Sequence, residues 1–211
     1  MKQDHDPLLE ISGICGMLSP SIAFAGIMLG VLFFPHFSWT QSALSDLGVA
    51  KGISSQLYNY GLMLSALPAI IFTYGLFVFL KKGILGKIGI AVFFLAAMAL
   101  ACIGAFPSNM QPAHYQASAA FFVLFPISMF FMSAEFFIST KPRLALLTLL
   151  LSFAAVLVWV VQWMVGFGSG VAIPETVAAL CVSAWTFYFG YKFFTASKIW
   201  AMPQPFPLGT A

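Results

Sequence analysis

Apolar residues fall in six long runs along the chain, and short polar segments separate them. Each run has about 19 to 26 residues, enough for one helix to cross a hydrocarbon core roughly 30 Å thick. A backbone in lipid must satisfy its own hydrogen bonds, so each run is expected to be helical. The runs are Ile11 to Phe34, Leu57 to Leu80, Ile88 to Phe106, Ala113 to Ile138, Leu144 to Val165 and Thr176 to Phe194. The pattern predicts an all-α, polytopic integral membrane protein with six transmembrane helices.

The domain organisation follows from these runs. Residues 11–194 are predicted to form one transmembrane domain, with an N-terminal tail at 1–10 and a C-terminal tail at 195–211. The connection at 35–56, between the first two runs, is far longer than the others. A connection of this length in a compact domain is commonly functional. We therefore expect this loop to contribute to any site.

Composition excludes several classes of protein. Hydrophobic residues make up 61% of the chain and charged residues 7%, whereas soluble domains carry about 25% charged residues. The net charge of +3 is too small to indicate nucleic-acid binding. No phosphate-binding motif of the form GxxxxGK[ST] is present, so no nucleotide is expected either. The partner that this composition predicts is membrane lipid, with a homo-oligomer or a larger complex left open.

The basic residues predict the orientation of the helices. Lys51 stands alone on one side of the six-helix arrangement. The other side carries eight basic residues: Lys2, Lys81, Lys82, Lys87, Lys141, Arg143, Lys192 and Lys198. Cytoplasmic segments of membrane proteins are enriched in Lys and Arg. Both termini are therefore predicted to be cytoplasmic, in a multi-pass protein of the plasma membrane.

Three ionisable residues are predicted to share the outer membrane level. Asp46 lies in the long outer loop, His114 follows Pro112, and Glu175 follows Pro174. Proline favours the first helical position, so both pairs are interpreted as helix starts. Because even-numbered helices begin at the outer surface in this topology, the three side chains are brought to one depth. Ionisable residues near a bilayer are functional candidates.

The chemistry of these three residues suggests a hydrolytic site. A neutral histidine beside two carboxylates can hold a divalent metal or act as a general base. Asp46, His114 and Glu175 are thus candidate catalytic residues and metal ligands, and Ser45 is a neighbouring hydroxyl. Helical spacing would place Ser42 on one face with Asp46. Further candidates for a supporting role are Asn59, His36 and Ser108.

Simpler interpretations of the same residues remain open. Asp46 can hydrogen-bond its own loop, and His114 and Glu175 can be solvated residues at helix ends. His36 fits an aromatic interfacial stretch. Glu135, near the inner end of the fourth run, is expected to extend towards Lys141 and Arg143 as charged side chains do at membrane boundaries.

Several sequence blocks resemble one family. The segment SALSDLG, Asn59 early in the second run, Phe106 to His114 (FPSNMQPAH) and Ile173 to Leu180 (IPETVAAL) occur in the order typical of a membrane family called domain of unknown function 998. Asn109 stands where that family often has an acid. The layout is also similar, more distantly, to the six-helix Frag/DRAM/Sfk proteins. That second resemblance implies an association with lipid remodelling or membrane lipid organisation.

Three hypotheses for function follow. The first is an enzyme acting on lipid headgroups or lipid-linked substrates at the extracytoplasmic face, with a divalent metal activating water. The second is a non-catalytic protein that binds or transports lipid or a small hydrophobic ligand. The third is an accessory subunit of a membrane complex. The sequence leaves open whether the protein is an enzyme.

Overall fold

The computed structural model describes residues 6–201, with the backbone alone for 198–201. Six long helices and one short 3-10 helix account for most of this range, and it contains no strand. The elements are α1 (Pro7–Leu32), η1 (Leu44–Val49), α2 (Ile53–Leu80), α3 (Ile84–Ala105), α4 (Ala113–Ile138), α5 (Pro142–Met164) and α6 (Ala172–Ala201). All six long helices are long and apolar enough to span a bilayer. The all-α, six-span prediction is confirmed.

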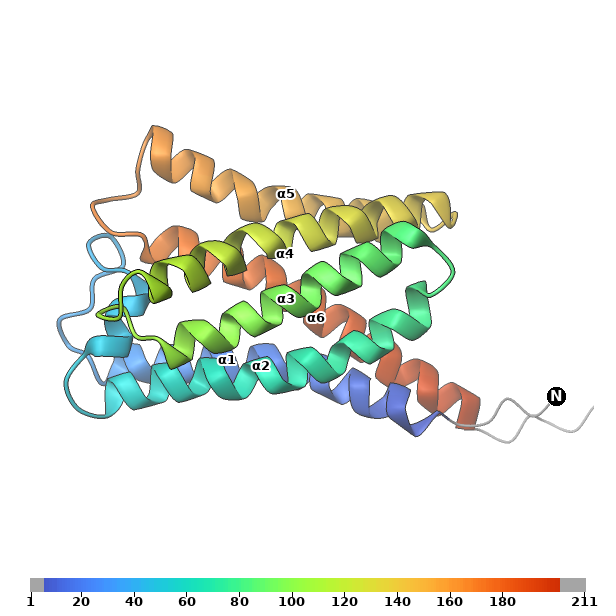
Figure 1. The fold of residues 1–211 in the computed structure, drawn as a ribbon, viewed down its shortest axis with the longest axis horizontal. Helices are drawn as coiled ribbons and strands as arrows, with labels where there is room; N and C mark the ends of the chain where they lie inside the picture. The colour runs from blue at the N-terminus through green and yellow to red at the C-terminus, as the bar shows by residue number, and fades with distance from the viewer. Residues whose placement is uncertain (1–5, 202–211) are drawn as a thin grey trace, which may run out of the picture.

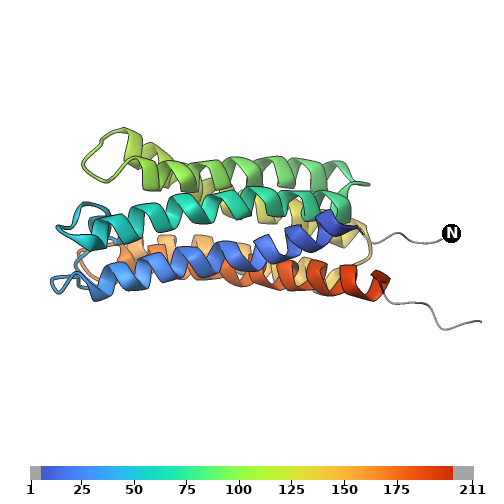
Figure 2. The ribbon, with the colours of Figure 1, turned by 90° about the horizontal axis from the view of Figure 1, so that it is seen from below.

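The six helices form a closed ring in chain order. Each helix packs against its neighbours in the sequence, and α6 returns to pack on α1 (Figures 1 and 2). One end of the ring, here called the loop end, carries η1 and the connections 33–52, 106–112 and 165–171 (Figure 1). The opposite end, the terminal end, carries Asp6, residue 201 and the two shorter connections.

Some helices extend beyond the apolar runs. Asp6 caps α1 by accepting hydrogen bonds from the amides of Leu8 and Leu9, at 3.0 and 3.3 Å. This cap, with Pro7 at the first helical position, starts α1 four residues before Ile11. α6 exceeds its run at both ends. The boundaries proposed for the two tails therefore fall inside helices, while residues 1–5 and 202–211 lie outside the described part.

Aromatic side chains fill the centre of the ring towards the terminal end. Trp185 is fully buried, and its indole N–H donates to Thr148 Oγ1 at 2.9 Å. Phe136 and Phe189 stack with ring centroids 5.4 Å apart. Phe72 packs edge-on against Trp185 at 6.2 Å. Burying rings of this size provides much of the packing energy of a core.

Small residues allow the helices of the ring to approach closely. Gly190 of α6 lies against the backbone of α1 at Gly13 and Gly16. Gly26 and Gly61 make a similar approach between α1 and α2. Helix pairs in lipid rely on such close packing, because the hydrophobic effect does not drive association there.

The outward faces of the ring are apolar. Leu64, Leu67 and Phe153 are more than 60% exposed although they lie in the middle of their helices. A soluble bundle would place polar residues at such positions. Together with the six spans, these faces identify a multi-pass membrane protein whose ring contacts lipid.

The buried acid at the terminal end has a role that the sequence did not reveal. Glu135 was expected to extend towards Lys141 and Arg143, but its side chain is only 5% exposed. Its Oε2 accepts from the amide of Gly86 at 3.3 Å, and its Oε1 accepts from the Ser139 hydroxyl at 3.0 Å. Glu135 therefore caps the first turn of α3, because the amides there have no partner within their own helix.

Candidate functional site

The long connection between α1 and α2 folds over the loop end of the ring (Figure 1). Leu44 and Leu47 of η1 are 4% and 0% exposed, so they belong to the core. The Asn59 side-chain amide donates to the Gly48 carbonyl at 2.9 Å, which fixes the end of η1 on α2. The sequence did not predict that this loop would be an ordered, half-buried cover.

The connection between α5 and α6 is hydrogen-bonded to the loop that carries η1. The amide of Gly170 donates to the Thr40 carbonyl at 3.0 Å, and the amide of Ala172 donates to the Ser42 carbonyl at 2.9 Å. The two connections are distant in sequence, but these bonds join their backbones like neighbouring strands. The start of α6 is thereby fixed beside η1.

Two carboxylates bind successive amides at the N-terminus of η1. Asp46 Oδ2 accepts from the Ala43 amide at 2.8 Å. Glu175 Oε2, from the first turn of α6, accepts from the Leu44 amide at 2.6 Å. Helix N-termini present unpaired N–H groups with partial positive charge, which carboxylates satisfy. Asp46 thus bonds its own loop, and Glu175, 8% exposed, joins α6 to that loop.

His114 closes the connection between α3 and α4. Its side chain is 5% exposed, and Nδ1 lies 2.6 Å from the Phe106 carbonyl oxygen. A carbonyl can only accept, so Nδ1 carries the proton and donates it. In the neutral ring Nε2 is then an acceptor, and the Ser118 hydroxyl lies 3.4 Å from it. Ser118 is one helical turn from His114 on the same face.

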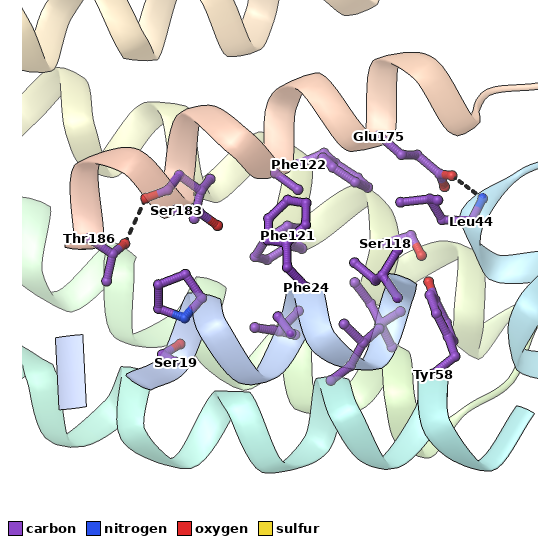
Figure 3. A pocket seen from close by; sticks show the side chains of 18 residues that line it. Ser19, Phe24, Leu44, Tyr58, Ser118, Phe121, Phe122, Glu175, Ser183 and Thr186 are labelled. Atoms are coloured by element: carbon purple, nitrogen blue, oxygen red, sulfur yellow. Dashed lines mark hydrogen bonds between the residues drawn. The ribbon is translucent and has the colours of Figure 1, made fainter. Parts of the chain in front are cut away.

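A cavity of about 70 Å³ lies inside the ring beneath η1. Figure 3 shows its lining between α1 and α6, with Glu175, Ser118 and Tyr58 at the η1 end. Ser19, Ser183 and Thr186 lie farther along. The rest of the wall is apolar and includes Phe24, Leu44, Phe121 and Phe122.

Glu175 brings an acid to this otherwise mainly apolar cavity. Its Oε2 accepts from the Leu44 amide, and no donor to its Oε1 is found within residues 6–201. Glu175 lines the cavity, and a carboxylate in apolar surroundings is stabilised by a donor or a positive charge. The cavity can therefore accept a ligand group that donates a hydrogen bond or carries positive charge.

Of the three residues that the sequence grouped, the structure brings Asp46 and Glu175 to successive amides at the start of η1, and it places His114 at the connection between α3 and α4. Glu175 lines the cavity and His114 reaches it only through Ser118, whereas Asp46 faces a surface hollow with His36, Ser42 and Lys51. No three His, Cys, Asp or Glu side chains in the described chain are placed to hold a metal ion. Asp46 and His114 are instead each turned towards a backbone partner.

The catalytic candidate Ser45 and the supporting candidates lie outside the wall of the cavity. Ser42 precedes η1, so it does not share a helical face with Asp46, and its hydroxyl accepts from the Ser38 amide at 3.2 Å. Ser45 lies in η1 but not in the cavity wall. Ser108 accepts a side-chain bond through its backbone carbonyl. His36 is exposed, and its ring packs edge-on against Phe34 at 6.2 Å.

Two residues of the cavity were missed by sequence reasoning. Tyr58 is 5% exposed and lines the cavity beside Glu175. Ser118 contributes its hydroxyl from α4. The spacing of four residues between His114 and Ser118 was the available signal, since it places both side chains on one helical face. Nothing in the sequence distinguishes Tyr58 from other interfacial tyrosines.

The fold and this site define a class: a multi-pass integral membrane protein with an intramembrane cavity closed at one end by an ordered loop. Residues 17–192 match the family described as Protein of unknown function (DUF998), and the chain belongs to that family. The matched range contains η1, His114, Ser118 and Glu175. No curated protein and no solved structure matches the chain.

Proposed function

We propose that this protein binds a lipid or lipid-linked molecule in the cavity beneath η1. The observation that carries the proposal is a buried acid, Glu175, with one oxygen free of protein donors, in a narrow and mainly apolar cavity. At about 70 Å³ the cavity has room for one part of an amphiphile, whose polar end reaches Glu175 while the adjoining part of its chain packs on Phe121 and Phe122. Pockets that bind ligands commonly combine apolar walls with few polar groups.

The charge of the cavity restricts the headgroup. A carboxylate repels phosphate but attracts an ammonium group and accepts from hydroxyls. The Tyr58 and Ser118 hydroxyls beside Glu175 can each donate or accept. The headgroup we expect therefore carries hydroxyl or ammonium groups close to the membrane surface.

The basic residues support an orientation for this site. Of the basic side chains that the structure describes, Lys51 alone belongs to the loop end. Lys2 lies outside the described residues, as does the side chain of Lys198. The positive-inside rule then places the terminal end in the cytoplasm and the cavity in the outer half of the plasma membrane.

Filling the cavity tests the proposal. Ala179→Phe introduces a ring into the wall on α6, and we expect it to remove lipid that co-purifies with the wild-type protein. Native mass spectrometry in mild detergent measures that lipid. Ala184→Phe, at an exposed position of the same helix, is the matched control and should keep it. Equal occupancy in wild-type protein and in the folded Ala179→Phe variant would show that the lipid binds elsewhere.

One observation favours a catalytic version of this function. Ser118 is near His114 Nε2, and the Phe106 carbonyl orients the ring through Nδ1. Other helical hydroxyls, such as those of Thr176 and Thr186, donate instead to a carbonyl in their own helix. A hydroxyl next to an oriented histidine is the arrangement of an activated nucleophile.

The corresponding reaction is acyl transfer. Ser118 Oγ attacks an ester carbonyl while its proton passes to His114 Nε2, and that proton then goes to the departing alcohol. The acyl group stays on Ser118 until water, deprotonated by His114, releases it as the carboxylic acid. This version keeps the predicted hydrolase but assigns the chemistry to Ser118 and His114 without a metal.

An alkyl fluorophosphonate tests this version, since it labels activated serines covalently. We expect Ser118→Ala to abolish labelling and His114→Asn to lower its rate by about 100-fold or more. Ser183→Ala, farther along the same cavity, should label normally. Labelling of folded Ser118→Ala at the wild-type rate would eliminate the nucleophile, leaving lipid binding as the function.

A further inference from the structure

A second hollow, of about 430 Å³, lies at the terminal end of the ring. Its wall includes Phe79 near the end of α2, Lys141 between α4 and α5, Arg143 in the first turn of α5, and Lys192 of α6. Two segments that are distant in sequence, residues 141–143 and α6, thus bring three cations to one concave surface. The hollow lies at the opposite end of the ring from η1 and shares no residue with the cavity beneath it.

Positive charge accumulates around Lys141. Its Nζ lies 4.1 Å from the centroid of the Phe79 ring, which partly covers it. Burial, followed by the positive charges of Lys192 and Lys82, lowers the pKa of Lys141, and the negative charge of Glu135 opposes this. Like charges gathered in this way repel one another, so an anion in the hollow would be stabilised.

Glu135 offsets only part of this positive charge, because it is one acid beside three cations and does not belong to the wall of the hollow. Both oxygens of Glu135 are engaged, one by the Gly86 amide and the other by the Ser139 hydroxyl. Its carboxylate therefore serves the start of α3. In addition, no side chain caps the N-terminus of α5, so that helix end contributes further positive potential beside Arg143.

We propose that this hollow binds the phosphate of an anionic phospholipid from the leaflet at the terminal end. Lys141, Arg143 and Lys192 supply the charge, and the guanidinium can bind two phosphate oxygens at once. Phe79 and Leu144 provide apolar wall for the adjoining glycerol and chains. The hollow sits where two transmembrane helices end, at the depth of lipid headgroups, and basic pockets at that depth bind anionic lipids. A lipid is thus favoured over a soluble phosphate.

The test compares lipid binding by the purified full-length chain in detergent, measured by native mass spectrometry with phosphatidylglycerol and phosphatidylcholine. We expect the wild-type protein to prefer phosphatidylglycerol. Lys141→Gln/Lys192→Gln should weaken phosphatidylglycerol binding by about tenfold or more, because each basic residue contributes to the attraction. Lys81→Gln/Lys87→Gln removes the same charge from exposed positions at that end and should change binding less than about twofold.

Other outcomes are equally decisive. Lys141→Arg/Lys192→Arg keeps the charge and should retain binding, which separates charge from folding. Equal loss in both glutamine variants would overturn the site and indicate a diffuse surface effect. Displacement of phosphatidylglycerol by millimolar inorganic phosphate, with no lipid preference remaining, would assign the hollow to a soluble anion instead. The Lys141→Gln/Lys192→Gln variant should keep the lipid bound in the cavity beneath η1. The proposal for this hollow and the proposed function can therefore be disproved separately.

Discussion

Glu175→Ala is expected to detach η1 from α6 and to destabilise the loop end of the protein. The Leu44 amide, which is buried, would lose the one partner that it has within residues 6–201, and a hydrogen bond to a charged group contributes about 1.5–3 kcal/mol. Glu175→Gln keeps an acceptor and should lose less. Hydrogen exchange of amides 43–50 measures the effect, and we expect these amides to exchange at least about tenfold faster in Glu175→Ala.

A neighbouring residue provides the control for this prediction. Thr176 donates its hydroxyl to the Ala172 carbonyl of its own helix, at 2.7 Å. Thr176→Ala therefore removes a hydrogen bond from the same turn without touching η1, and exchange of residues 43–50 should stay at the wild-type rate. Unchanged exchange in Glu175→Ala as well would mean that the bonds from Asn59, Gly170 and Ala172 hold the loop in place without Glu175.

The two buried acids have the same structural role at opposite ends of the ring. Glu175 binds an amide of η1 that is 131 residues away in sequence, and Glu135 binds an amide of α3 that is 49 residues away. Each accepts from an amide near a helix N-terminus that has no acceptor within its own helix. Acids inside this bundle therefore act first as caps for other elements. Glu175 differs in that it also lines a cavity.

The sequence predicted the helices better than their ends. Helix number and approximate position follow from local apolar runs, because lipid forces each run to satisfy its own backbone. The ends of the helices were harder to predict. The helix α1 starts next to its cap, Asp6, and Pro174 is the third residue of α6 rather than the first. Such shifts depend on single hydrogen bonds that hydropathy does not describe.

The sequence predicted the end of the ring at which the candidate residues lie, but not the hydrogen bonds that their side chains make. Asp46, His114 and Glu175 were chosen because topology places them at one end. Their side-chain directions depend on loop geometry, and the 3-10 turn at Leu44–Val49 directs Asp46 to its own N-terminus. The short bond from His114 to Phe106 likewise depends on how the chain turns between α3 and α4. Neither turn has a signature in the pattern of polar residues.

Gly190→Leu is expected to have the largest effect on folding of any substitution considered. A Cβ at this position would lie 2.7 Å from the Gly13 carbonyl oxygen and 2.8 Å from the backbone at Gly16 and Met17. Backbone atoms cannot rotate away as side chains do, so α1 and α6 must separate. Overpacking typically costs about 1–3 kcal/mol and more where the backbone has to move. We expect a lower melting temperature and little monodisperse protein in size-exclusion chromatography.

Ala184→Leu adds the same bulk to an exposed position of α6 and is the matched control. In lipid or detergent this change should leave the melting temperature close to wild type, since the added side chain meets only apolar solvent. A Gly190→Leu protein as stable as the control would mean that α1 and α6 are not in contact at this crossing. The ring would then be open between these helices, and the cavity beneath η1 would lose the wall that α1 provides through Ser19, Ala23 and Phe24.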